Sequence, residues 1–197
     1  MPDLRGTQTL LNLCNAFAGE SQARNRYSFF AKQARAEGYE QIGWIFDDTS
    51  NNEHEHATNF YNHVIHYLDA TDVLVLPVNA EYPFGLGTTL QNLRNAAFGE
   101  HDEWSNLYPK FAKVATDEGF ADIANRFTEV SEAEYGHEQR YLKLISNIEQ
   151  GTVFKSDTIV RWRCRECGYI HEGYEPPLTC PSCGHPRAFY ELMPQNY

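Results

Sequence analysis

The chain has 197 residues, 42% of them hydrophobic, which is enough for one ordinary domain and a small additional module. Its formal net charge of −11 and isoelectric point near 5.1 argue against nucleic acid and anionic membrane surfaces as partners. No apolar run reaches the roughly 18 residues of a membrane span, and the N-terminal segment lacks the apolar core of a signal peptide. We therefore expect a folded protein in the cytoplasm.

The first half of the chain predicts a helical hairpin, with helices over about 7–37 and 40–68 divided by Gly38. One seam of the first helix carries a glutamate where an apolar residue belongs: Leu10, Leu13, Phe17, Glu20, Arg24, Tyr27, Ala31 and Ala34. The seam of the second helix also contains metal-ligand residue types: Ile42, Ile45, Thr49, Glu53, His56, Phe60, Val64 and Tyr67. Residues 69–87 are rich in proline and glycine and predict a long connection that crosses the bundle.

The second half predicts another helical hairpin, over about 88–118 and 120–149, divided by Gly119. The seam of its first helix comprises Leu93, Ala97, Glu100, Glu103, Leu107, Phe111 and Val114. The seam of its second helix comprises Ile123, Phe127, Val130, Glu134, His137, Tyr141, Leu144 and Ile148. Together the two hairpins predict an all-α four-helix bundle with a long crossover.

The two hairpins are copies of one another, because residues 15–42 align with residues 95–123 and the helices that follow align as well. Each copy contributes one isolated glutamate and one Glu-x-x-His quartet. The corresponding pairs are Glu20 with Glu100, Glu53 with Glu134 and His56 with His137. A pseudo-twofold axis should therefore relate two halves of one site.

These six residues predict a binuclear metal site. Residues three apart share a face of a helix, so each Glu-x-x-His quartet aims a carboxylate and an imidazole at the same point. Two such quartets, with a glutamate from each remaining helix, are the ligands of di-iron carboxylate bundles. Unpaired buried carboxylates would cost several kcal/mol each, and the seams offer mainly Arg24 for the alternative, a salt-bridge network. Oxygen-rich ligation with one histidine per metal suits iron or manganese.

The third helix holds one residue more than its counterpart in the first copy. The offset between the copies is 80 residues at Gly99-Glu100 and 81 residues from Phe111 onward. We expect a π-bulge between Glu100 and Phe111, which would turn Glu103 toward the metals. The alternative is an insertion absorbed at a helix end.

Other ligand-type residues have weaker claims. Tyr27 and Tyr108 are equivalent in the repeat and should face the site, either as hydroxyl donors to ligand carboxylates or as plain core residues. Cys14 is expected to be a small core residue. The remaining histidines are expected at the surface: His54, His63, His66, His101, His171 and His185.

After the linker 152–160, the tail 161–197 is too small for a core of its own, so we expect a metal to hold it. Its pairs Cys164-x-x-Cys167 and Cys180-x-x-Cys183 predict a tetrathiolate site rather than two disulfides. Four sulfurs suit zinc, which would be structural, or a single iron, which would carry one electron at a time.

The chain closely resembles the rubrerythrin family over essentially its whole length. The matching stretches are AFAGESQARNRY at 16–27, GEHDE at 99–103, WRCRECGY at 162–169 and CPSC at 180–183. The resemblance implies a ferritin-like di-iron domain over 1–151 and a rubredoxin-like domain with one iron on four cysteines over 161–197.

The resemblance also implies roles for the ligand candidates. Glu53 and Glu134 would bridge the two irons, and terminal ligands would be Glu20, Glu100 and His137. One iron would exchange a ligand between His56 and Glu103 when its redox state changes.

The activity implied by the resemblance is reduction of hydrogen peroxide to water in defence against oxidative stress. Electrons would pass from NAD(P)H through the rubredoxin-like iron. The chain has no Gly-x-Gly-x-x-Gly between a predicted strand and a helix, so an external rubredoxin or NAD(P)H-dependent reductase must supply them. The resemblance further implies a homodimer, or a higher oligomer, in which the tail of one chain serves the di-iron site of another.

Two other functions account for part of the pattern. A ferritin-like ferroxidase or iron-handling protein would use the bundle, but iron storage gives the four-cysteine tail no role. A redox-sensing or structural protein would hold zinc in the tail. Colour distinguishes that case, since ferric tetrathiolate is red and zinc tetrathiolate is colourless.

Overall fold

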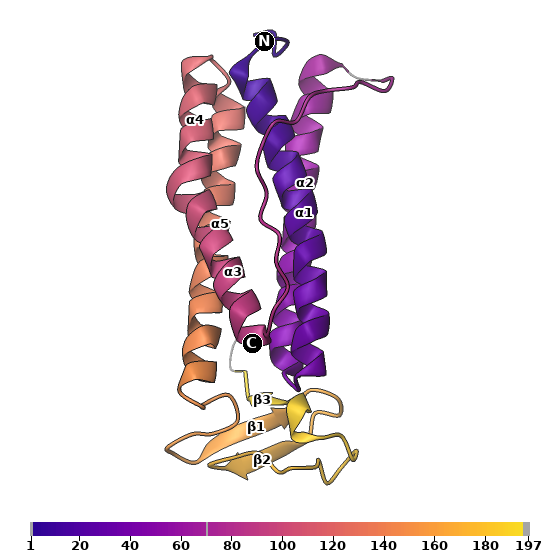
Figure 1. Ribbon diagram of the computed structural model, residues 1–197, viewed down its shortest axis with the longest axis vertical. Helices are drawn as coiled ribbons and strands as arrows, with labels where there is room; N and C mark the ends of the chain where they lie inside the picture. Colours follow the sequence, from indigo (N-terminus) through magenta and orange to yellow (C-terminus); the bar gives the residue numbers. More distant parts are fainter. Residues whose placement is uncertain (1, 70, 195–197) are drawn as a thin grey trace.

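The computed structural model describes residues 2–69 and 71–194 and shows two helical hairpins side by side, with a small β module at one end (Figure 1). The first hairpin comprises α1 (Gln8–Ala36) and α2 (Glu40–Leu68). The second comprises, in chain order, α3 (Thr89–Asp102), the π-helix η1 (Glu103–Leu107), α4 (Tyr108–Asp117) and α5 (Ala121–Glu149). The expected four-helix bundle is thus confirmed. None of the described helices combines the length and the hydropathy that a membrane crossing requires.

The helix ends follow from local chemistry that the repeat duplicates. Gly38 and Gly119 end the first helix of each hairpin with φ of 86° and 88°, a conformation that glycine adopts without steric cost. Each hairpin also caps the other. The Glu118 carboxylate accepts the amides of Gln8 and Thr9 at the start of α1, and Glu37 accepts the amide of Thr89 in α3. These caps fix the two hairpins end against end.

The connection between α2 and α3 runs the length of the bundle beside α1, as expected for a crossover (Figure 1). The Tyr82 hydroxyl donates to the carbonyl of Asn15 at 3.0 Å, and the Arg26 guanidinium donates to the carbonyl of Pro83 at 3.4 Å. The connection therefore packs on α1.

The bundle core has two hydrophobic clusters. One joins the first half of α1 and the second half of α2 to α4 and the first half of α5, and the other joins the opposite halves of α1 and α2 to α3 and the end of α5. Two expected seam residues are misplaced: Phe17 is 38% exposed and Arg24 is exposed, whereas the neighbouring Ala16 and Ala23 are buried. A small rotation of a helix about its axis buries the neighbouring residue in place of the expected one. Ala16 and Ala23 are too small to have indicated this in the hydrophobic pattern.

The tail forms a three-stranded antiparallel sheet in the order β2-β1-β3. Its elements are β1 (Val160–Cys164), β2 (Ile170–Gly173), the 3₁₀ turn η2 (Arg187–Phe189) and β3 (Tyr190–Leu192). Trp162, Cys164, Cys180 and Tyr190 form its small buried cluster. The tail packs against the end of the bundle, where the Arg165 guanidinium lies over the Trp44 ring at 4.9 Å.

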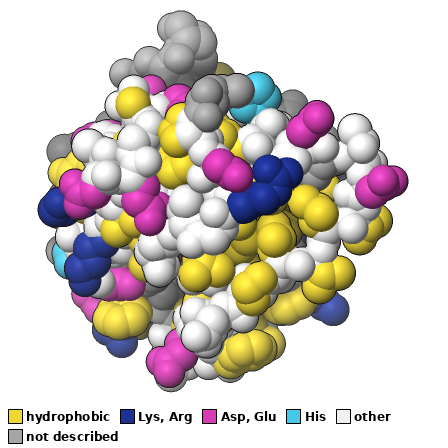
Figure 2. Space-filling view, turned by 90° about the horizontal axis from the view of Figure 1, so that it is seen from above, with side chains coloured by type: hydrophobic (Ala, Val, Ile, Leu, Met, Phe, Trp, Pro, Cys, Tyr) yellow, Lys and Arg dark blue, Asp and Glu magenta, His cyan; other side chains and the backbone are white. Residues whose placement is uncertain are grey.

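Figure 2 looks down on the bundle from the end at which α1 begins. Hydrophobic side chains gather on part of this face, among separate acidic and basic groups. The connection contributes strongly exposed apolar residues to the surface of the molecule, with Val73 and Val75 more than nine-tenths exposed.

Candidate metal centres

The bundle brings the six predicted ligand residues together in its interior. Two overlapping groups each place one ligand atom per residue within 4.8 Å of the others. The first group is Glu20, Glu53, His56 and Glu134, and the second is Glu53, Glu100, Glu134 and His137. Because Glu53 and Glu134 belong to both groups, the geometry suits two cations that share two carboxylates. The two groups are related by the sequence repeat, as the pseudo-twofold axis requires.

Five carboxylate oxygens and one imidazole nitrogen of this cluster are buried without a hydrogen-bond partner. No hydrogen bond reaches Glu20 Oε2, Glu53 Oε1, Glu100 Oε2, either carboxylate oxygen of Glu134, or His137 Nδ1. His137 Nδ1 lies only 2.8 Å from Glu134 Oε2, yet the two atoms do not have hydrogen-bond geometry. Among the described residues, no lysine or arginine pairs with these carboxylates; Arg24 faces solvent, and the buried Arg26 is bonded to Gln22 and Pro83. Atoms placed in this way fit shared cations better than a salt-bridge network.

The protein's own electrostatics also favour cations here. Burial and the neighbouring Glu53 carboxylate raise the pKa of Glu100 to about 8. Burial and the charges of Glu134 and Glu53 raise the pKa of Glu20 well above its usual range. Burial alone would lower the pKa of His56, but its contacts with Glu134 and Glu53 raise it to about 10. Without metal, then, protons must supply part of the positive charge that this cluster requires.

Two tyrosines bond across the pseudo-twofold axis to the isolated glutamates. The Tyr27 hydroxyl donates to Glu100 Oε1 at 2.6 Å, and the Tyr108 hydroxyl donates to Glu20 Oε1. Both tyrosines are 1% exposed. The structure therefore selects the hydroxyl-donor interpretation over plain core packing, and each hairpin orients a ligand candidate of the other.

The expected π-bulge is present as η1, which begins three residues after Glu100. The amide of Tyr108 donates to the carbonyl of Glu103, five residues earlier, as in a π-helix. Glu103 is partly buried, and burial together with Glu100 and Glu134 raises its pKa well above the usual range. It lies beside the cluster but belongs to neither four-residue group.

Sequence reasoning missed one polar contact to the site. Asn52, directly before Glu53, places its Oδ1 3.2 Å from Nε2 of His137. A partner on this outer nitrogen fixes the tautomer that leaves Nδ1 free for a metal. The repeat has alanine, Ala133, at the equivalent position, so the pattern gave no signal for it.

The expectation that the remaining histidines lie at the surface holds for three of the six. None of the six other histidines joins a ligand group among the described residues. His54, His66 and His101 are exposed, and His63, His171 and His185 are partly buried. Cys14 is buried in the first core cluster, as expected.

The four tail cysteines form a second group whose sulfurs all lie within 4.8 Å of one another. Cys164 Sγ is 3.8 Å from Cys183 Sγ, and Cys167 Sγ is 3.7 Å from Cys180 Sγ. Sulfurs bound at metal–sulfur distances near 2.3 Å in a tetrahedron stand about 3.8 Å apart. These distances fit a tetrathiolate metal site and exclude disulfides.

Comparison with known proteins agrees with both sites. The profile of the rubrerythrin family matches residues 12–145, and that of the rubrerythrin rubredoxin-like domain matches residues 162–191. The chain is 50% identical to the rubrerythrin of Clostridium perfringens and 43% identical to that of Nitratidesulfovibrio vulgaris, in each case over all of both chains. Its fold is similar to that of nigerythrin in a mixed-valence state, with a TM-score of 0.63, 31% identity, and coverage of 98% of this chain and 92% of the other.

Proposed function

The chain belongs to the rubrerythrin family of oxidoreductases, and we propose that it is a non-haem di-iron peroxidase that reduces hydrogen peroxide to water. The observation that carries the proposal is the combination, in one chain, of a binuclear carboxylate-histidine cluster with a four-sulfur site. Two bound irons at the first site would supply two electrons together to peroxide, and one iron at the second would carry electrons singly. An iron-storing protein has no use for the second site.

We base the ligand roles on the geometry of the two groups together with the family resemblance. Glu53 and Glu134 would be shared by the two irons, because both groups include them. Glu20, Glu100 and His137 would each hold one iron, and His56 would exchange with Glu103. Support for the alternation comes from the position of Glu103, which lies at the start of the π-helix beside the cluster while His56 occupies the ligand group. The bundle and tail, 1–151 and 161–197, act as the two working units.

Peroxide reduction consumes two electrons and two protons and yields two waters. A cavity of about 570 Å³ lies beneath the crossing connection, and its lining includes Arg26, Tyr82, Glu103 and Tyr108. Glu103 lines this cavity and is close enough to Glu100 and Glu134 for their charges to raise its pKa, so we propose that its carboxyl group carries a proton between solvent and substrate. Tyr27 and Tyr108 hold Glu100 and Glu20 in place through their hydroxyl groups.

We further propose that electrons originate from NAD(P)H through an external reductase and reach the cluster from the tail of another copy of the chain. Within one chain, the tail contacts Trp44, and Glu53 lies nine residues further along α2. The helical rise over those residues is about 14 Å. The distance from the Trp44 contact to the four cysteine sulfurs adds to this path. A homodimer that brings a partner's tail beside the cluster would shorten this path.

The test is an anaerobic oxidation experiment on iron-loaded protein whose metal content has been measured. The protein is reduced, the colour of the ferric tetrathiolate is followed, and H₂O₂ or O₂ is added in equal amounts. We expect H₂O₂ to restore the colour much faster than O₂. Faster restoration by O₂ would favour the ferroxidase function, and a colourless, zinc-filled tail would favour a structural or sensing role.

A further inference from the structure

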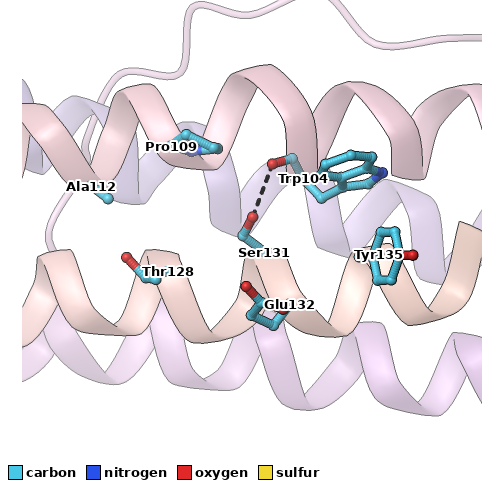
Figure 3. Close-up of a pocket in the computed structure, with 7 residues that line it drawn as sticks. All are labelled: Trp104, Pro109, Ala112, Thr128, Ser131, Glu132 and Tyr135. Atoms are coloured by element: carbon cyan, nitrogen blue, oxygen red, sulfur yellow. Dashed lines mark hydrogen bonds between the residues drawn. The ribbon is translucent and has the colours of Figure 1, made fainter.

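The π-helix leaves the backbone carbonyl of Trp104 without an amide donor four or five residues later. In η1 the amide of Tyr108 donates to Glu103 and so is not available to Trp104. The following amide position belongs to Pro109, which has no N–H. Ser131 of α5 supplies the missing donor, because its hydroxyl donates to the Trp104 carbonyl at 3.0 Å (Figure 3).

The side chain of Trp104 is held by the same helix. Its indole Nε1 donates to Glu138 Oε2 at 2.7 Å, and the edge of its ring meets Tyr135 at a centroid distance of 5.2 Å (Figure 3 shows these two rings). The other oxygen of Glu138 lies 3.0 Å from Nδ1 of His101. Glu138 is 8% exposed, so both of its oxygens are engaged in a largely water-free position.

These contacts connect η1 to the metal centre through one helix. Ser131, Tyr135 and Glu138 are spaced by four and three, and therefore form a single stripe on α5. Glu134 and His137, on the neighbouring stripe, belong to the ligand groups. Trp104 directly follows Glu103 in the chain, so any constraint on the Trp104 backbone also constrains Glu103.

We propose that Ser131 and Glu138 clasp Trp104 and thereby fix the backbone of the π-helix in the conformation that keeps Glu103 within reach of the metal centre. Ser131, Trp104 and Glu138 are positioning residues in this arrangement, because they act through Glu103. The inference rests on the proposed function, in which Glu103 is an exchangeable ligand.

The sequence repeat supplies a matched control. Ser50 is the counterpart of Ser131, and its hydroxyl donates to the carbonyl of Arg24 at 2.9 Å. Arg24 lies inside the regular helix α1, where the amide four residues later already serves its carbonyl. Loss of the Ser50 hydroxyl therefore leaves the Arg24 carbonyl with its backbone donor. Loss of the Ser131 hydroxyl leaves the Trp104 carbonyl without a donor.

The first experiment measures amide hydrogen exchange across residues 103–108 in the full-length, iron-loaded protein. Ser131→Ala should accelerate exchange there by about tenfold, the equivalent of one lost hydrogen bond. Ser50→Ala should leave that segment unchanged, and Ser131→Thr, which keeps a hydroxyl, should restore slow exchange. Trp104→Phe, which keeps a ring but lacks the indole N–H, should accelerate exchange as well. Equal exchange in the two alanine variants overturns the clasp.

The second experiment asks whether the clasp acts through Glu103. Iron binding is measured in both redox states on Ser131→Ala, Glu103→Gln and the double variant, by anaerobic titration with Fe²⁺ and by the rate at which a chelator removes iron from the oxidised protein. In the redox state in which Glu103 is a ligand, we expect Ser131→Ala to weaken iron binding by about three- to tenfold in the wild-type background and to add nothing in the Glu103→Gln background. An equal loss in both backgrounds contradicts action through Glu103. If Glu103→Gln leaves iron binding unchanged in both redox states, the ligand role in the proposed function fails, while hydrogen exchange still decides on the clasp.

Discussion

At the scale of single residues, two ligand carboxylates of the cluster accept hydrogen bonds from side chains that are not themselves ligands. Glu20 and Glu100 are each fully buried and each accept one tyrosine hydroxyl, from Tyr108 and Tyr27 respectively. A buried carboxylate that loses such a donor retains its desolvation penalty without compensation. The hydroxyl groups should therefore matter for stability as well as for ligand orientation.

Tyr108→Phe tests this dependence. We expect the variant to lose about 1–3 kcal/mol of unfolding free energy, because Glu20 keeps its burial and loses its donor. Urea unfolding of the iron-loaded protein, followed by far-UV circular dichroism, measures the change. Tyr61→Phe is the control, since Tyr61 is 49% exposed and its ring packs on Phe17. An unchanged midpoint for Tyr108→Phe would show that the bond contributes nothing net.

At the scale of elements, each hairpin caps the other through a carboxylate at its turn. Burial by itself would raise the pKa of Glu118, but the hydrogen bonds from Thr9 and Gln8 outweigh it, and the pKa lies below its usual value of 4.5. A carboxyl group whose pKa is depressed by folding stabilises the protein above its unfolded pKa. That contribution is lost as the pH falls through the folded value.

Glu118→Gln should therefore cost about 1 kcal/mol at pH 7, the typical worth of a helix cap, and progressively less as the pH falls below 4.5. The measurement is urea unfolding of wild type and variant across that range. Glu37→Gln should behave in the same way, since hydrogen bonds from Gln33 and Thr89 lower the pKa of Glu37 although desolvation alone would raise it. A difference that stays constant with pH would contradict the capping role of the charge.

Much of this architecture could be predicted because the chain repeats itself. The change of offset from 80 to 81 residues placed one extra residue between Glu100 and Phe111, and the π-helix lies there, at Glu103–Leu107. The six ligand candidates were identifiable because polar residues at seam positions must be compensated. Gly38 and Gly119 indicated the helix ends because glycine readily adopts a positive φ, and both residues have one in the structure.

The contacts that could not be predicted depend on how one helix is rotated against another. Phe17 was expected in the seam, but the burial of Ala16 turns it outward. Asn52 and Ser131 reach their partners only across helix interfaces, and neither has a distinctive place in the hydrophobic pattern. Residue spacing describes one helix at a time, so such cross-helix bonds need the three-dimensional structure.

At the scale of the whole molecule, the bundle and the tail depend on different sources of stability. The bundle buries two hydrophobic clusters, whereas the tail buries only a few side chains around its sulfurs. Cys167→Ser should therefore remove the tail's metal and its order, and stop turnover that is driven by a reductase, while the helices stay folded. Metal analysis, circular dichroism and a coupled peroxide assay measure these three outcomes. Loss of helicity would show that the bundle requires the tail.

The tail is placed on the bundle by a small contact that should be separable from both units. Arg165 lies over the Trp44 ring, and Tyr39 stacks with Phe154 of the linker at 6.2 Å. A cation–π pair contributes about 0.5–1 kcal/mol where it is open to solvent and about 2 kcal/mol where it is desolvated, so removing this half-exposed pair should loosen the docking without unfolding either unit. If the tail must serve a partner's cluster, its docking position is part of the electron path.

Trp44→Ala should therefore increase proteolytic cleavage within the linker 152–160 by about two- to fivefold and slow reductase-driven turnover, while both metal sites remain filled. Tyr61→Ala is the matched control on the same helix, because Tyr61 is 49% exposed and Trp44 is 48% exposed. Tyr61 lies seventeen residues further along α2, about 25 Å from the tail contact. Cleavage that rises equally in both variants would mean that the bundle itself has loosened. Cleavage unchanged in both would mean that the tail is held by the remaining contacts, because the Trp44 ring would then add nothing to the docking.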